Sequence, residues 1–160
     1  MIDKRALISQ IRAQLEAQAA AMRASVAATH EAATHEEARP ENDKDTRGLE
    51  ASYLARGQAM RVEELEEAVN RLRFLDLRDF GPDEPIGLGA LITVLVDETS
   101  AVYFLVPVAG GTKVVVDGVP VQLVTPAAPL GRALVDKVVG DDFLLRVAGR
   151  EREYEVEDVS

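Results

Sequence analysis

The sequence predicts an α+β fold: an N-terminal antiparallel α-helical hairpin followed by a small, mainly antiparallel β domain with one short helix. Apolar residues recur at steps of three and four up to Asp76, and short β-rich runs follow beyond it. These are the periods of an amphipathic helix and of a strand. Gly81-Pro82 and Pro85-Ile86-Gly87 mark a linker at the change of period. We therefore expect two domains, residues 1–77 and 78–160.

Two apolar stripes predict the helices of the hairpin. The first stripe consists of Ile8, Ile11, Leu15, Ala19, Met22 and Val26, and the second consists of Ala51, Ala55, Ala59, Val62, Leu65, Val69 and Leu72. Neither stripe can be buried by its own helix, so we expect the two helices to pair as a coiled coil. The small alanines in both stripes allow a close approach of the two backbones.

An acidic stretch near residues 36–46 separates the two helices and forms the expected tip. Pro40 disfavours helix at Arg39 and so ends the first helix at or before that point. Asp43, Asp45 or Thr46 can cap the second helix by accepting a hydrogen bond from its first N–H groups.

The second half contains six β-rich runs separated by turn signals such as Gly110-Gly111, Asp117-Gly118 and Gly149-Arg150. The runs are residues 91–96, 101–106, 113–116, 119–124, 143–147 and 151–156. A helical interval, Pro129 to Lys137, begins with the proline that favours a first helical position. In the interpretation that gives this short helix a purely structural role, it covers the sheet and Leu130 and Leu134 pack inward.

Composition narrows the functional classes. The chain of 160 residues carries a formal charge of −10 and contains no cysteine or tryptophan. Residues 78–160 hold 14 acidic and 7 basic side chains, against 14 and 11 in residues 1–77. Without a basic stripe, we expect no direct stable binding of DNA or RNA. Absence of cysteine excludes thiolate metal sites and cysteine nucleophiles, and no apolar run is long enough to span a membrane.

The tip carboxylates are candidate metal ligands. Glu41, Asp43 and Asp45 alternate as they do at the start of a calcium loop, but Thr46 replaces the glycine and Ser52 replaces the bidentate glutamate that such a loop requires. A stand-alone calcium site is therefore not expected. A few carboxylates can still share a Mg²⁺ that another molecule holds. Polar turn residues and helix caps are the alternative interpretation of the same tip.

The segment Ala128-Pro129-Leu130-Gly131-Arg132-Ala133-Leu134, with Val139-Gly140-Asp141 after it, resembles the C-terminal signature of the Gre transcript-cleavage factors. That signature commonly reads Ser-Pro-Leu-Gly-Arg-Ala-Leu and continues to a Val-Gly-Asp turn. The closing residues 150–160 are similar to the last strand of the family. Glu41-Asn42 and the helix from Tyr53 to Leu72 resemble the tip and the second helix of its coiled coil.

This resemblance implies a bacterial transcription elongation factor with a coiled-coil hairpin and an FKBP-like domain. In this family the β domain docks at the rim of the secondary channel of RNA polymerase, and the hairpin enters that channel. The polymerase is the implied partner, and Ala128, Pro129, Leu130 and Arg132 are the implied docking residues. Ala128 stands where the family has serine, which removes one hydrogen-bonding group from that surface.

The resemblance further implies that tip carboxylates help to hold Mg²⁺, the only expected cofactor, while the polymerase hydrolyses its own backtracked RNA. Glu41 matches the family's Glu-Asn pair, and its acidic partner is either Glu37 or Asp43. Asp45 belongs to the same set of candidate catalytic carboxylates. The Asp43-x-Asp45 tip also resembles that of DksA-type regulators, so channel binding without cleavage stimulation remains an alternative.

We expect a cytoplasmic monomer that is not itself an enzyme, because no nucleophile–base pair and no phosphate-binding glycine loop is found in the sequence. Prolyl isomerase activity is a weak rival, since Tyr103, Phe104, Phe143 and Tyr154 are too few and too scattered to line such a pocket. Self-association through the hairpin is a second rival, although its small stripe residues favour pairing within one chain.

Overall fold

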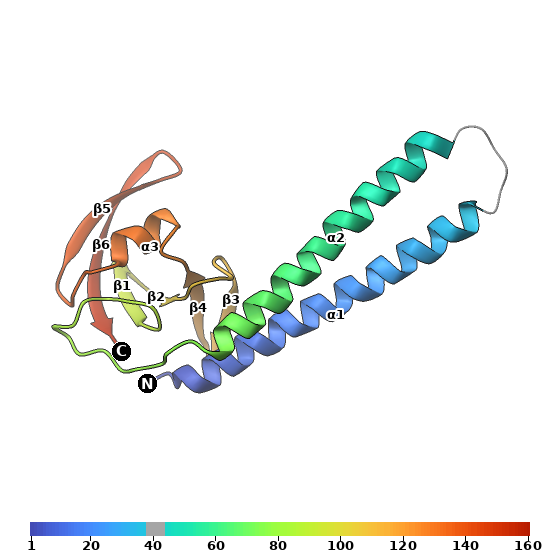
Figure 1. Ribbon diagram of the computed structural model, residues 1–160. Helices are drawn as coiled ribbons and strands as arrows, with labels where there is room; N and C mark the ends of the chain where they lie inside the picture. Colours follow the sequence, from blue (N-terminus) through green and yellow to red (C-terminus); the bar gives the residue numbers. More distant parts are fainter. Residues whose placement is uncertain (38–43) are drawn as a thin grey trace. The chain divides into compact units, whose positions relative to one another are not determined.

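The computed structural model describes the backbone of residues 1–37 and 44–160 and the side chains of residues 1–31 and 49–160. The elements are α1 (Lys4–Glu37), α2 (Lys44–Arg73), β1 (Leu91–Val96), β2 (Thr99–Leu105), β3 (Lys113–Val116), β4 (Val119–Val124), α3 (Pro129–Leu134), β5 (Asp142–Val147) and β6 (Arg150–Val159). Figure 1 shows their order along the chain. The predicted α+β class, with a helical hairpin before a sheet domain, is confirmed.

Backbone contacts divide the chain into two compact units, residues 12–70 and residues 1–11 with 71–160. The sequence placed the boundary at residue 77, whereas the contacts group the first residues of α1 and the end of α2 with the sheet. Leu7 and Ile11, at the start of α1, belong to the unit that contains the sheet, and both are completely buried.

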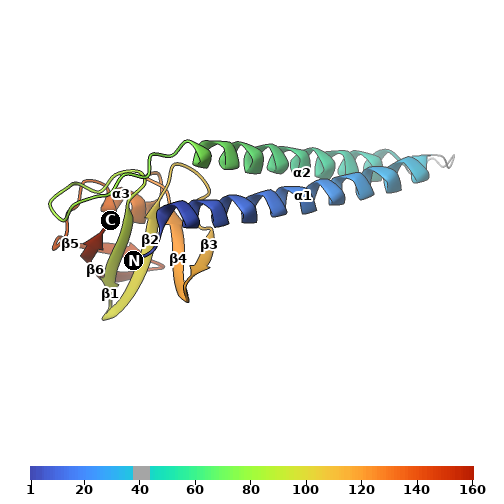
Figure 2. The same cartoon turned by 90° about the horizontal axis from the view of Figure 1, so that it is seen from below.

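The hairpin unit consists of the central and distal parts of α1 and α2, which run in opposite directions (Figures 1 and 2). Leu15, Ala19, Val62, Leu65 and Val69 are buried along it, as the apolar period predicts. An ion pair joins Arg23 of α1 to Glu66 of α2. The two side chains are about half exposed, so this pair contributes little beyond the apolar contacts.

One predicted seam position is wrong. Ala59 is exposed, and Gln58 is half-buried in its place. A paired helix requires apolar positions that alternate in steps of three and four, and this alternation runs through Ala55, Gln58, Val62 and Leu65. Ala59 lies beside this face of the helix. Polarity favours alanine over glutamine at a buried position, but helical geometry decides which residue faces the neighbour.

The six strands form one sheet in the order β3-β4-β2-β1-β6-β5. All neighbouring pairs are antiparallel except β2 and β4, which are parallel, with Val102 opposite Val121 and Leu105 opposite Val124. The sheet is thus mixed, and it is mainly antiparallel as the sequence predicts. The connection from β2 to β4 passes through β3, so β4 pairs with β3 on one side and returns beside β2 on the other.

The core of the sheet domain lies under α3. It comprises Phe80, Ile86, Ala90, Ile92, Val94, Leu105, Val124, Leu134, Tyr154, Val156 and Val159. Leu130, Val135 and Phe143 pack against this cluster. The side chains of β1 and β6 that enter the core follow the period of two that the sequence shows, with one shift in register between Thr93 and Val94.

Three tight turns connect antiparallel strands. Both central residues have positive φ at Asp97-Glu98, Asp117-Gly118 and Ala148-Gly149. This is the conformation of a type I′ turn, whose twist matches that of the flanking strands.

In the described part of the chain, no helix combines the length and the apolar character that spanning a membrane requires.

Candidate docking surface and hairpin tip

The tip residues lie only partly within the described structure. Glu37 is the last residue of α1 and Asp45 is the second residue of α2. Glu41 and Asp43 lie outside the described residues, as does the geometry of any ligand set that they form. Among the residues with described side chains, no three His, Asp or Glu residues are close enough together to hold a metal ion. The tip carboxylates therefore stay a sequence-based prediction.

The motif that carries the family resemblance forms α3 and the turn before it. Ala128 occupies the N-cap position with an extended backbone, and Pro129 begins the helix. No side chain caps the helix at this position. A serine here would accept a hydrogen bond from the first N–H groups of the helix, so the hydroxyl that this chain lacks is one that would serve the helix itself.

Gly131 is required by a close backbone approach. A Cβ atom at this position would lie 1.9 Å from the carbonyl oxygen of Thr125. Only glycine allows α3 to pack this closely against the segment that leads into it. The glycine of the motif thus has a structural reason, independent of any partner.

The remaining motif residues divide into an exposed pair and an inward-facing pair. Pro129 and Arg132 are exposed, whereas Ala128 and Leu130 are half-buried and pack against the core. Arg132 Nη2 donates a hydrogen bond of 2.8 Å to the carbonyl oxygen of Ala127. This contact fixes the guanidinium beside the turn, where its remaining N–H donors face solvent.

Three backbone hydrogen bonds tie the segment that follows α3 to the linker. Ile86 N–H donates to the Lys137 carbonyl oxygen (2.8 Å), and Asp136 N–H donates to the Ile86 carbonyl oxygen (3.1 Å). Val139 N–H donates to the Pro82 carbonyl oxygen at 3.1 Å. The segment that the sequence marked as a linker is therefore a structural support of the candidate docking helix.

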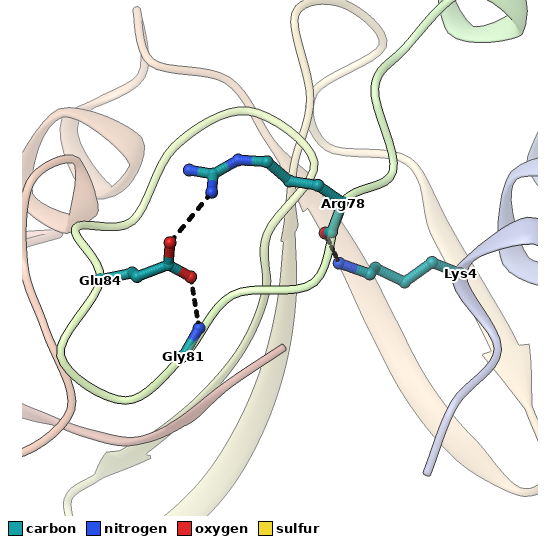
Figure 3. A network of polar contacts seen from close by, with 4 residues as sticks. All are labelled: Lys4, Arg78, Gly81 and Glu84. Carbon is teal, nitrogen blue, oxygen red and sulfur yellow. Dashed lines mark hydrogen bonds and ion pairs between the residues drawn. The ribbon is translucent and has the colours of Figure 1, made fainter.

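A polar network holds the start of α1 against the same linker (Figure 3). Lys4 Nζ donates to the carbonyl oxygen of Arg78 at 2.5 Å. It also donates to the carbonyl oxygen of Gly89 at 3.2 Å and lies 5.3 Å from the centre of the Phe80 ring. The Arg78 guanidinium lies over the same ring at 4.1 Å. Arg78 also pairs with Glu84, whose second carboxylate oxygen accepts a hydrogen bond from Gly81 N–H.

Burial shifts the pKa of Lys4, and hydrogen bonding shifts the pKa of Glu84. Desolvation lowers the pKa of Lys4, and this effect exceeds the opposing attraction of Asp79. The hydrogen bond from Gly81 N–H lowers the pKa of Glu84, and Arg78 acts in the same direction. The ammonium group of Lys4 is retained because two carbonyl oxygens and an aromatic face replace its water.

Sequence reasoning missed Lys4, Arg78, Phe80 and Glu84. Lys4 reads as one more charged residue near the N-terminus, and its partners lie 74 and 85 positions away in the chain. Phe80, an aromatic residue between charges in a glycine- and proline-containing linker, was the available signal.

Comparison with known proteins adds the following similarities. No family model matches the chain. The chain is 29% identical over 96 residues to the transcription elongation factor GreA of Rhodospirillum rubrum, a match that covers 60% of this chain and 58% of that protein. The matched region is thus less than two thirds of the length of the relative.

Two solved structures also resemble the chain. Gfh1 of Thermus aquaticus is 21% identical, with a TM-score of 0.41 and coverage of 91% of both chains. GreA/GreB from Nitrosomonas europaea is 19% identical, with a TM-score of 0.37, coverage of 62% of this chain and 78% of that chain. The match to GreA confirms the resemblance that the α3 motif indicated: the chain is similar to Gre-type transcription elongation factors.

Proposed function

We propose that this protein is a transcription elongation factor that binds RNA polymerase at its secondary channel and stimulates the Mg²⁺-dependent cleavage of backtracked RNA by the polymerase. The sequence match to GreA carries this proposal. The α3 motif supports it, because Pro129 and Arg132 are exposed on a rigid support while Gly131 and Leu134 hold the helix in place.

In this proposal, α3 and the turn before it form the docking surface. Arg132 offers planar N–H donors suited to a carboxylate of the polymerase. Pro129 offers an apolar contact that has no conformational freedom to lose on binding. Ala128 and Leu130 act through the core and position this surface.

The tip supplies carboxylates to the active site of the polymerase. Glu41, with Asp43 or Glu37, would hold Mg²⁺ jointly with the polymerase, and Asp45 stands next to this set. When bound there, the metal would activate water and stabilise negative charge on the phosphate. The factor contributes ligands and orientation, while the polymerase performs the hydrolysis.

RNA release from a stalled, backtracked polymerase complex tests the proposal. We expect the purified protein to accelerate cleavage above the intrinsic rate in proportion to its occupancy of the polymerase. Binding to polymerase with cleavage at the intrinsic rate would instead show a channel regulator without cleavage activity, the alternative that the Asp43-x-Asp45 tip favours. No binding to the polymerase would contradict both functions.

A further inference from the structure

Strand β5 forms one edge of the sheet and leaves a row of backbone groups without a strand partner. The opposite edge, β3, is different, because Gln10 Nε2 donates to the carbonyl oxygen of Val115 at 3.0 Å. In the described part of the chain, no residue bonds in this way to the outer side of β5. An open edge is a template for pairing with another strand.

The register with β6 identifies the free groups. Ala148-Gly149 is a two-residue turn, so Val147 and Arg150 form the hydrogen-bonded pair beside it, and such pairs alternate along the ladder. The other end of the β5–β6 ladder shows the same alternation of hydrogen-bonded pairs. There the N–H of Val156 donates to the carbonyl oxygen of Asp141, and its carbonyl oxygen accepts from the N–H of Gly140. The backbone groups of Asp142, Leu144 and Arg146 therefore face away from the sheet.

The side chains of these same three residues share one exposed face. Leu144 is 63% exposed at the centre of the strand. Asp142 and Arg146 lie two positions to either side of Leu144, and neither makes an ion pair among the described residues. In the register with β6, Arg146 lies opposite Glu151, whereas Asp142 lies opposite Glu155. Only the second of these cross-strand pairs is like-charged, and such a pair is unfavourable.

We propose that β5 pairs antiparallel with β5 of a second copy of this chain, with Leu144 opposite Leu144 of the second copy. This register uses the backbone groups that β6 leaves free. It places Asp142 opposite Arg146 of the second copy and Arg146 opposite Asp142, so each strand is complementary to itself about a two-fold axis. The exposed leucines meet at the centre, and the Asp142–Glu155 repulsion gains a neighbouring cation.

The interface is small, and the net charge of −10 on each chain repels the second copy. The dimer is therefore weak, so the monomer expected from the sequence prevails at low concentration. Salt favours the dimer because it screens this long-range repulsion. The pairing uses the outer edge of β5 and no residue of α3, although α3 contacts β5, and it does not depend on the proposed role in transcription. A test without polymerase therefore separates the two ideas.

Sedimentation of the full chain over a range of concentrations tests the dimer. We expect the protein to form a dimer as its concentration rises, and Arg146→Asp to raise the dissociation constant at least about tenfold, because like charges then lie opposite each other. The double variant Asp142→Arg with Arg146→Asp exchanges the charges and restores complementarity. We expect it to dimerise to within about threefold of the unmodified chain.

Leu144→Pro tests the backbone pairing. The substitution removes an N–H that the sheet does not use, a change that edge strands tolerate, so the circular dichroism and thermal unfolding of the monomer should be retained while the dimer is lost. The proposal is overturned if the unmodified chain stays monomeric up to about 1 mM, because a dissociation constant above this value corresponds to negligible association. Dimerisation of a folded Leu144→Pro variant, or failure of the charge exchange to restore the dimer, would overturn it as well.

Discussion

Individual residues of the α3 motif and of the start of α1 have roles that follow from single contacts. The carbonyl oxygen of Thr125 leaves no space for a side chain at Gly131. The carbonyl oxygens of Arg78 and Gly89 accept hydrogen bonds from Lys4. Arg132 differs from both, since its contact with Ala127 leaves most of its donors exposed. These contacts separate residues needed for the fold from residues available to a partner.

Gly131→Ala should lower the free energy of unfolding by about 1–3 kcal/mol, because the added Cβ would overlap a backbone atom that cannot move independently. Urea unfolding followed by circular dichroism measures this change. Gly57→Ala is the matched control: a Cβ there meets nothing within 4 Å. Since alanine is the better helix former, the control should gain about 1 kcal/mol. Similar effects of the two substitutions would contradict the close approach.

Lys4→Met should destabilise the fold by about 1–3 kcal/mol at neutral pH, because two carbonyl oxygens lose their donor. The pH dependence has a definite sign. The pKa of Lys4 is lowered in the folded chain, so between that pKa and the ordinary value of about 10.4 the unfolded chain binds more protons, and stability rises with pH.

The advantage of the unmodified chain over Lys4→Met should therefore grow as the pH increases from neutral toward about 10. Unfolding free energies of both proteins across this range measure the difference. A difference that shrinks with pH would mean that the folded state favours the ammonium form more strongly than water does.

At the scale of elements, the helices depend on how their ends and faces are satisfied. The short helix α3 starts without a side-chain cap at Ala128. The longer helix α2 carries Gln58 on its buried face, where its Oε1 is shielded from solvent and has no hydrogen-bond partner among the residues with described side chains. Both features are places where the sequence departs from what the local structure prefers.

Ala128→Ser should stabilise α3 by about 1 kcal/mol, because the hydroxyl can accept a hydrogen bond from the N–H of Leu130 or Gly131. Slower hydrogen exchange at these two amides, together with a higher unfolding temperature, would demonstrate the new cap. Ala127→Ser, one position earlier and exposed, should leave both measurements unchanged. Equal protection in the two variants would argue against Ala128 as the N-cap.

Gln58→Leu should stabilise the hairpin unit by about 1–2 kcal/mol, because an unsatisfied amide oxygen is replaced by apolar surface. Gln18→Leu places the same side chain at an exposed position of α1 and should have little effect. Thermal unfolding of the two variants compares them directly. If Gln58→Leu destabilises the chain instead, the amide has a role in pairing that its surroundings do not show.

At the scale of the whole molecule, the proposed function assigns different tasks to α3 and to the hairpin tip. Docking affects how much factor is needed, whereas the tip carboxylates affect how fast the docked complex cleaves RNA. The two tasks can be separated by titrating variants against a fixed amount of backtracked complex.

Arg132→Ala should raise the factor concentration for half-maximal cleavage about tenfold with little change in the maximal rate, because it removes exposed donors. Glu41→Gln should lower the maximal rate at least about tenfold and leave the half-maximal concentration unchanged, since it removes a metal ligand. Each variant is the control for the other. A loss of maximal rate in Arg132→Ala, or of docking in Glu41→Gln, would contradict the division of tasks.

Local patterns determined much of this protein. Steps of three and four between apolar residues, such as Ile11 to Leu15 and Val62 to Leu65, indicated the two long helices. Alternation of apolar and polar residues indicated the strands, because a helix and a strand bury residues at fixed periods. The order of residues in the α3 motif was enough to indicate the Gre resemblance. Pro129 predicted where its helix begins.

Tertiary structure alone decided the rest. The parallel pairing of β2 with β4, the burial of Lys4 against Arg78 and Gly89, and the free groups of β5 all join or separate residues distant in the chain. No local period encodes such contacts, because they depend on which surfaces meet once the whole core has formed. Gln58 shows the same rule within a helix, since the neighbouring helix, rather than residue polarity, selects the buried face.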